Sequence, residues 1–146
     1  MAFTLPNHAP IGSLLKGDKK PRKQARSVKD SSHRKFVSGL PCIVSGVEGR
    51  TQVAHLRFAS AEYGKPITGG STKPDDLWTL PLAHSAHMAQ HNHGDERDWW
   101  RSWGLEDPLV VCHRLWMVSG DVEAGIQIIR ETMEVMRTNL NQRDRS

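Results

Sequence analysis

The sequence predicts a small α+β protein with a C-terminal helical cap and a disordered basic N-terminal arm. Three observations lead to this fold class. Two short segments with strand character lie at 51–56 and 77–80, where Thr, Val and Trp supply β propensity. From residue 95 onward, capping residues and apolar spacing are typical of helices. Residues 1–35, by contrast, show neither a helical nor a strand period.

The first 35 residues are expected to be a flexible arm. Proline and glycine interrupt them, and nine Lys and Arg residues crowd the stretch from residue 16 to residue 35. Such a segment buries too little apolar surface to fold by itself, but its charge allows it to lie along phosphates. We therefore divide the chain into an arm (1–35), a central domain (36–120) and a C-terminal amphipathic helix with a tail (121–146).

The folded part is expected to begin near Phe36. After the first strand, a polar loop runs from about residue 57 to residue 76, and a loop of this length is usually functional or disordered. The second strand, 77–80, is followed by Pro81 and then by a histidine-rich helix. The whole order is thus strand, long loop, strand and helix.

The C-terminal part is expected to be helical. Asp95 is the predicted N-cap of a helix over 96–103, and Asp107 with Pro108 predicts the start of the next. Ser119-Gly120-Asp121 ends that helix near residue 118 and caps the last one. The last helix carries an apolar stripe at alternating three- and four-residue spacing: Ile126, Ile129, Met133, Met136 and Leu140.

Packing on the domain core is the expected role of this stripe. A dimer seam is the alternative, but only about two heptads are present, which favours a monomer. Four tryptophans raise a similar choice between core burial and base stacking, and we expect core burial. They are Trp99, Trp100, Trp103 and Trp116.

Bulk properties narrow the function classes. A net charge of +4 and a pI of about 9.3 favour a polyanionic partner such as DNA. Two cysteines are too few for a disulfide framework and fit a reducing compartment. No apolar run reaches the length of a membrane span, and the N-terminus lacks the apolar core of a secretory signal. We expect a soluble, cytoplasmic protein.

The most informative stretch holds four of the eight histidines within ten residues, from His84 to His93. In a helix His84, His87 and His91 lie on one face. Two imidazoles one turn apart, such as His87 and His91, can bind the same metal ion. The zinc protease motif with this spacing carries a Glu after its first His. Met88 stands at that position, so a protease is not expected.

The order of elements resembles the ββα-metal (His-Me finger) fold of HNH endonucleases. The similarity covers roughly residues 40–118 and looks like a bacterial and phage-associated subfamily that includes relatives of the phage recombination-enhancement nuclease. The segments that carry it are residues 54–57, residues 73–82, the pair His87 and His91, and residues 94–97 with Trp99 and Trp100.

The resemblance implies a one-metal phosphodiesterase that cleaves DNA. By position His55 is the general base, since a neutral imidazole accepts a proton from water at cellular pH. Arg57 lies two residues further and is a candidate phosphate clamp. The central Asn of the family falls at or near Trp78, and Asp76 is the candidate to replace it.

The same resemblance implies that His87 and His91 hold one divalent metal ion, namely Mg²⁺, Mn²⁺, Zn²⁺ or Ni²⁺. Many relatives have a further ligand just before the base, where this chain has Ala54. Water completes the shell in one interpretation; in the other, His84 or His93 fills in as a ligand. His84 is retained as a candidate ligand.

Two departures from the family leave a rival open. Relatives often bear a structural zinc held by four cysteines, which this chain excludes by count. Either packing replaces that zinc, which we favour, or Cys42 joins histidines in a mixed site. Together with Ala54, this leaves a catalytically degenerate nucleic-acid-binding module of the same fold as the alternative function. A metal-binding structural protein is a third possibility, and loss of fold on chelation would identify it.

Overall fold

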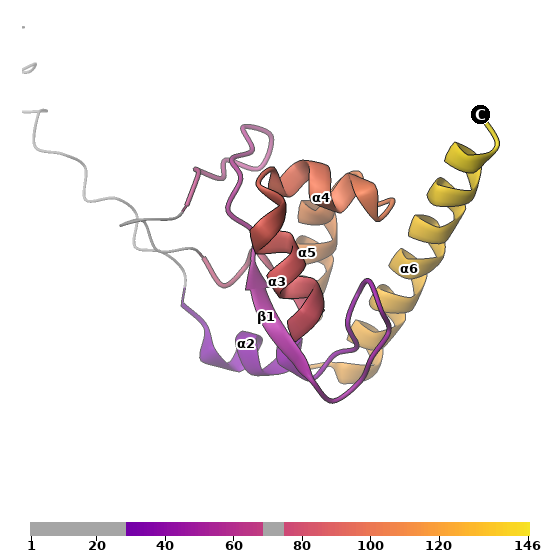
Figure 1. The fold of residues 1–146 in the computed structure, drawn as a ribbon. Helices are drawn as coiled ribbons and strands as arrows, with labels where there is room; N and C mark the ends of the chain where they lie inside the picture. The colour runs from indigo at the N-terminus through magenta and orange to yellow at the C-terminus, as the bar shows by residue number, and fades with distance from the viewer. Residues whose placement is uncertain (1–28, 69–74) are drawn as a thin grey trace, which may run out of the picture.

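The computed structural model describes residues 29–68 and 75–146. The described part is α+β, as the sequence predicts, with two strands and a series of helices around them (Figure 1). Residues 1–28 of the expected arm and residues 69–74 of the long loop lie outside it. The elements are α2 (Ser31–Ser38), β1 (Thr51–His55), β2 (Thr79–Ala83), α3 (His84–His93), α4 (Glu96–Ser102), α5 (Pro108–Met117) and α6 (Val122–Asp144).

The two strands form an antiparallel pair in which Val53 lies opposite Pro81. The second strand starts two residues later than predicted and includes Pro81, which we had placed between strand and helix. The carbonyl of Pro81 accepts a hydrogen bond from the Ile43 N–H at 3.0 Å, so this residue's backbone polar groups face away from β1. The missing N–H of proline therefore removes no bond between the strands.

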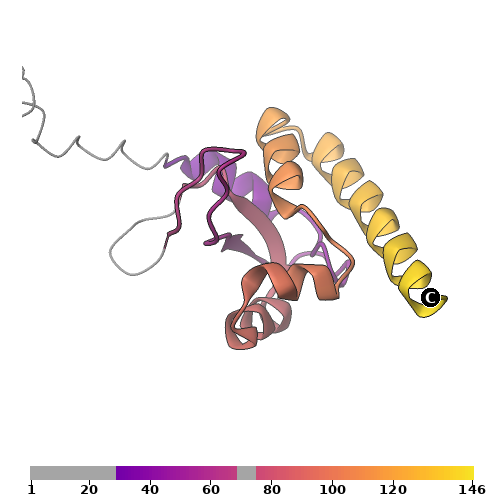
Figure 2. The same cartoon turned by 90° about the horizontal axis from the view of Figure 1, so that it is seen from above.

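The core lies between the sheet and the helices. Helices α2, α3 and α5 contact the strands, and α6 packs along α5 (Figure 2). Trp99 and Trp100 are buried as expected, but Trp103 remains 39% exposed. The Cys42 side chain is fully buried in this core. None of the helices in the described residues combines the length and the apolar character needed to cross a membrane.

Helix α2 is the main feature that the sequence did not predict. It begins at Ser31, so the boundary predicted at residue 36 falls inside it. The Asp30 side chain caps its first turn by accepting from the His33 N–H at 3.0 Å. A helix of eight residues is marginal alone, and this one is anchored through Phe36 and Val37, which are both buried.

The C-terminal helices follow the predicted caps at two of three positions. Asp95 and Asp121 each accept a hydrogen bond from the first turn of α4 and α6, respectively. Asp107 makes no such bond and instead accepts from the Tyr63 hydroxyl at 3.2 Å. Two residues of the apolar stripe of α6, Ile129 and Met136, are buried, so the stripe packs on the core.

Candidate functional site

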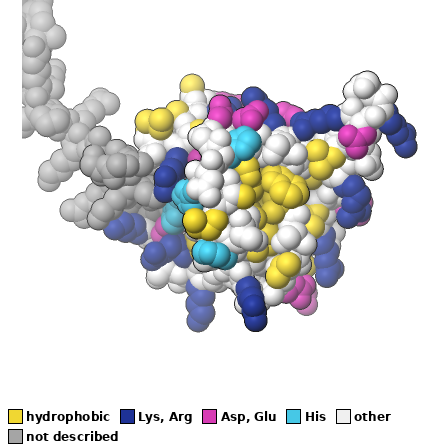
Figure 3. All heavy atoms as spheres, in the orientation of Figure 1, with side chains coloured by type: hydrophobic (Ala, Val, Ile, Leu, Met, Phe, Trp, Pro, Cys, Tyr) yellow, Lys and Arg dark blue, Asp and Glu magenta, His cyan; other side chains and the backbone are white. Residues whose placement is uncertain are grey.

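The end of β1, the second half of α3 and the start of α4 surround a pocket of about 260 Å³. Three residues singled out in the sequence, His55, Arg57 and His91, line it together. Gln90 and Glu96, which the sequence did not indicate, complete the polar part of its wall. Figure 3 shows histidine side chains gathered over β1 and α3 on this face, with Lys and Arg side chains around them.

His87 and His91 form a close pair of imidazoles. Their Nε2 atoms are 3.1 Å apart. Two nitrogens that bind one metal ion at about 2.0–2.1 Å lie roughly 3.0–3.4 Å from each other, depending on the coordination angle. The i, i+4 spacing on α3 thus yields the separation that a shared metal ion requires.

Gln52 of β1 orients this pair from the sheet. The His87 Nδ1–H donates to Gln52 Oε1 at 2.9 Å, and Gln52 Nε2 donates to His84 Nδ1 at 3.1 Å. Donation through Nδ1 leaves the His87 Nε2 lone pair available, which is the usual arrangement of a histidine ligand and its outer partner. Burial lowers the pKa of His87, as do the neighbouring His91 and Arg57, and the neutral ring is the ligand form.

The other two histidines of this segment lie outside this pair. His84 accepts from Gln52, and His93 contacts Asp98 at 2.9 Å. Across residues 29–68 and 75–146, no three or more His, Cys, Asp or Glu side chains gather in an arrangement suited to a metal ion. The structure thus brings His87 and His91 together. The candidate ligand His84 instead accepts a hydrogen bond from the side-chain amide of Gln52, which also contacts His87.

His55 and Asp76 form a second pair, at the end of β1. His55 Nε2 lies 2.8 Å from Asp76 Oδ1, with side-chain exposures of 25% for the histidine and 5% for the aspartate. An ionised carboxylate only accepts hydrogen bonds, so the neutral imidazole donates its Nε2–H. The lone pair then lies on Nδ1. This pairing of two predicted site residues brings together positions 21 apart in the chain.

Glu96 contributes a carboxylate to the wall of the pocket. Its carboxylate accepts from the Arg57 N–H at 3.0 Å and from Gln90 Nε2 at 3.0 Å. Burial raises the pKa of Glu96, and the hydrogen bond from the Arg57 backbone opposes that rise. The Oε1 atom of Gln90 is buried with no hydrogen-bond partner among the described residues. Gln90 and Glu96 thus connect α3, α4 and the segment that follows β1.

Sequence reasoning missed Gln52, Gln90 and Glu96 because each looks ordinary in its own segment. Glu96 follows an N-cap, where a carboxylate is expected from the helix dipole alone. Gln52 is an exposed strand residue, and only the contact between β1 and α3 reveals its partners. Ala54, which the resemblance placed at the position of a further ligand, is fully buried in the core. Comparison of the chain with family models, with curated proteins and with solved structures found no match.

Proposed function

We propose that this protein is a metal-dependent DNA endonuclease that hydrolyses phosphodiester bonds by a one-metal mechanism of the HNH type. One observation supports this function above all others. His55, held by the buried carboxylate of Asp76, lines the same pocket as His91, which pairs with His87. The proposed base and one histidine of the proposed metal pair thus line one pocket.

In this mechanism His55 activates the attacking water. Its Nε2–H is engaged by Asp76, so Nδ1 is the atom that takes the proton. Asp76 holds the imidazole in that tautomer and stabilises the imidazolium that forms, the same role that aspartate has in Ser-His-Asp sites. A neutral histidine has the right proton affinity for this step near neutral pH.

His87 and His91 would hold the divalent ion, with Gln52 fixing the His87 ring. A metal ion there supplies a Lewis acid for the charge that develops on the phosphate oxygens. Two imidazoles suit Zn²⁺ and Ni²⁺ better than Mg²⁺, which prefers carboxylate and water ligands. His84 supports this centre through Gln52.

The substrate is expected to be DNA, bound through its phosphates. Arg57 lines the pocket, and the chain carries a net charge of +4. Arginine offers the two-pronged hydrogen bonding that suits a phosphate. The basic residues of the arm add phosphate contacts whose strength depends on the salt concentration but not on the DNA sequence.

A supercoiled-plasmid nicking assay tests the proposal. Wild type, His55→Ala and the control His113→Ala, an exposed histidine on α5, would be compared in Mg²⁺, Mn²⁺, Ni²⁺ and Zn²⁺. We expect nicking by wild type and His113→Ala, and a loss of at least about 100-fold in His55→Ala with unchanged DNA binding. If wild type binds DNA but nicks it with none of these metal ions, the endonuclease proposal is rejected and the degenerate binding module is favoured.

A further inference from the structure

We infer that Arg34 on helix α2 is a positioning residue for the proposed general base. It holds Asp76, and through Asp76 it fixes the ring of His55. This inference rests on the proposed function and extends the site to a helix outside residues 40–118, the part that resembles the family. The site would then need α2, whose first five residues (31–35) lie where the sequence predicted a flexible arm.

The two oxygens of Asp76 serve different elements. Oδ1 faces His55 Nε2 at 2.8 Å. Oδ2 accepts from the Asp30 backbone N–H at 2.7 Å and lies 3.2 Å from Arg34 Nε. The Thr79 hydroxyl donates to the Asp76 carbonyl at 2.8 Å, which fixes the backbone at this point. Asp76 therefore links the start of α2 to the end of β1.

These contacts determine which way the carboxylate points. The terminal torsion of an aspartate is broad, so hydrogen bonds rather than rotamer preference set the plane of Asp76. Asp76 belongs to the connection between β1 and β2 and not to a strand. With Oδ2 held by the hydrogen bond from the Asp30 N–H and by the ion pair with Arg34, Oδ1 is directed at His55. Loss of Arg34 removes the ion pair and leaves Oδ2 with the Asp30 N–H alone.

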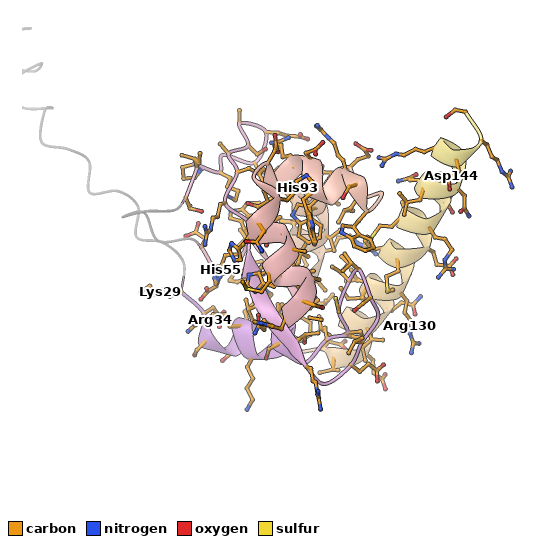
Figure 4. The ribbon with its side chains drawn as sticks, viewed as in Figure 1. Lys29, Arg34, His55, His93, Arg130 and Asp144 are labelled. Carbon is orange, nitrogen blue, oxygen red and sulfur yellow. The ribbon has the colours of Figure 1, made fainter. Side chains whose placement is uncertain are left out.

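Arg34 also balances the charge of a carboxylate that is only 5% exposed. A buried carboxylate is tolerated when it is paired and hydrogen-bonded. Within the described residues, the charged or titratable groups near Asp76 include Arg34, Asp30 and His33 from α2 and its cap, His55 from β1, and the adjacent Asp75. Figure 4 shows Arg34 and His55 on the same side of the molecule, with Arg130 on the distant helix α6.

The kinetic test compares Arg34→Gln with Arg34→Lys and with two controls. Arg130→Gln removes an arginine of α6, far from the site (Figure 4). Lys35→Gln removes an exposed cation from α2, the helix that carries Arg34. We expect Arg34→Gln to lower kcat by roughly 10- to 100-fold, as do other groups that orient a reacting residue, with KM changed less than about twofold. Arg34→Lys should recover part of kcat, and both controls should match wild type.

A double-mutant cycle asks whether Arg34 acts through Asp76. In an Asp76→Asn background, Arg34→Gln should cause little further loss, because the carboxylate that it holds is already gone. Independent losses would overturn the inference. A rise in KM with unchanged kcat, shared by Lys35→Gln, would also overturn it and assign Arg34 to phosphate binding.

A second readout does not depend on cleavage. Nitrogen NMR of the His55 ring distinguishes the Nε2–H tautomer from the Nδ1–H tautomer. We expect Nε2–H in wild type and in Arg130→Gln, and a mixture of both in Arg34→Gln. An unchanged tautomer in Arg34→Gln would overturn the inference. A tautomer change in a protein that never nicks DNA would support the positioning and reject the nuclease.

Discussion

Gln52 on β1 and His87 on α3 are joined by a hydrogen bond of 2.9 Å between Oε1 and Nδ1. The bond places the proton of His87 on Nδ1 and leaves Nε2 facing His91. A single strand residue thereby leaves a lone pair available on an imidazole of the neighbouring helix, as the proposed metal site requires. The same amide holds His84 through its other end, at 3.1 Å.

Replacing Gln52 by Ala should weaken metal binding by about 10- to 100-fold, the usual effect of losing the outer partner of a histidine ligand. Titration calorimetry with Ni²⁺ or Zn²⁺ measures this. Gln127→Ala, which removes an exposed glutamine on α6, is the matched control and should bind metal as wild type does. Equal affinities for Gln52→Ala and wild type would contradict the assignment.

Removing either imidazole of the pair should abolish stabilisation by metal. At a metal concentration about 100 times Kd, binding to the folded state adds about 2.7 kcal/mol to the free energy of unfolding. Urea unfolding with metal and with a chelator should show this gain in wild type and in His113→Ala. His87→Ala and His91→Ala should unfold alike in both conditions. A gain that persists in either variant would place the metal elsewhere.

Asp76→Ala should destabilise the fold as well as the site. The carboxylate accepts from the Asp30 N–H, pairs with Arg34 and faces His55, and hydrogen bonds to a charged group contribute about 1.5–3 kcal/mol. We expect a loss of about 2–3 kcal/mol in urea unfolding at neutral pH. Asp144→Ala, at the exposed end of α6, should lose less than about 0.5 kcal/mol. Equal stability of the two variants would show that the α2 contacts are dispensable.

His33 should make the fold sensitive to acid. Its ring is fully buried between α2 and α5, with Nδ1 at 2.8 Å from the Ser119 hydroxyl and Nε2 lacking a partner among the described residues. Burial lowers the pKa of His33 below its usual 6.5, while Asp30 and Asp76 partly oppose the shift. The folded state therefore favours the neutral ring.

Proton linkage gives the direction in which the free energy of unfolding changes with pH. Below pH 6.5 the unfolded chain binds a proton at this residue that the folded chain resists, so the free energy of unfolding falls as pH decreases towards the lowered pKa. The slope from one group reaches at most about 1.4 kcal/mol per pH unit. Urea unfolding from pH 7.5 to pH 5 should show a shallower decline in His33→Gln than in wild type. Parallel curves would contradict this role of His33.

Local sequence signals predicted several elements because they act over a few residues. The strand at 51–55, the caps Asp95 and Asp121 and the burial of Trp99 and Trp100 all agree with the structure. Helix α2 escaped prediction because its anchors are distant in sequence: the Asp30 N–H meets a carboxylate 46 residues away. The extension of β2 through Pro81 likewise depends on a distant residue. The N–H of Ile43, which lies outside the sheet, donates a hydrogen bond to the Pro81 carbonyl.

For the candidate site, the sequence by itself determined the pairing of His87 with His91. Helical periodicity brings residues four apart onto one face, and no other part of the chain is needed. Only the tertiary structure decided that Asp76 meets His55 and that Arg34 holds Asp76. These contacts join the β1–β2 connection, a strand and an unpredicted helix, and packing of the core brings such segments together. No short-range spacing encodes them.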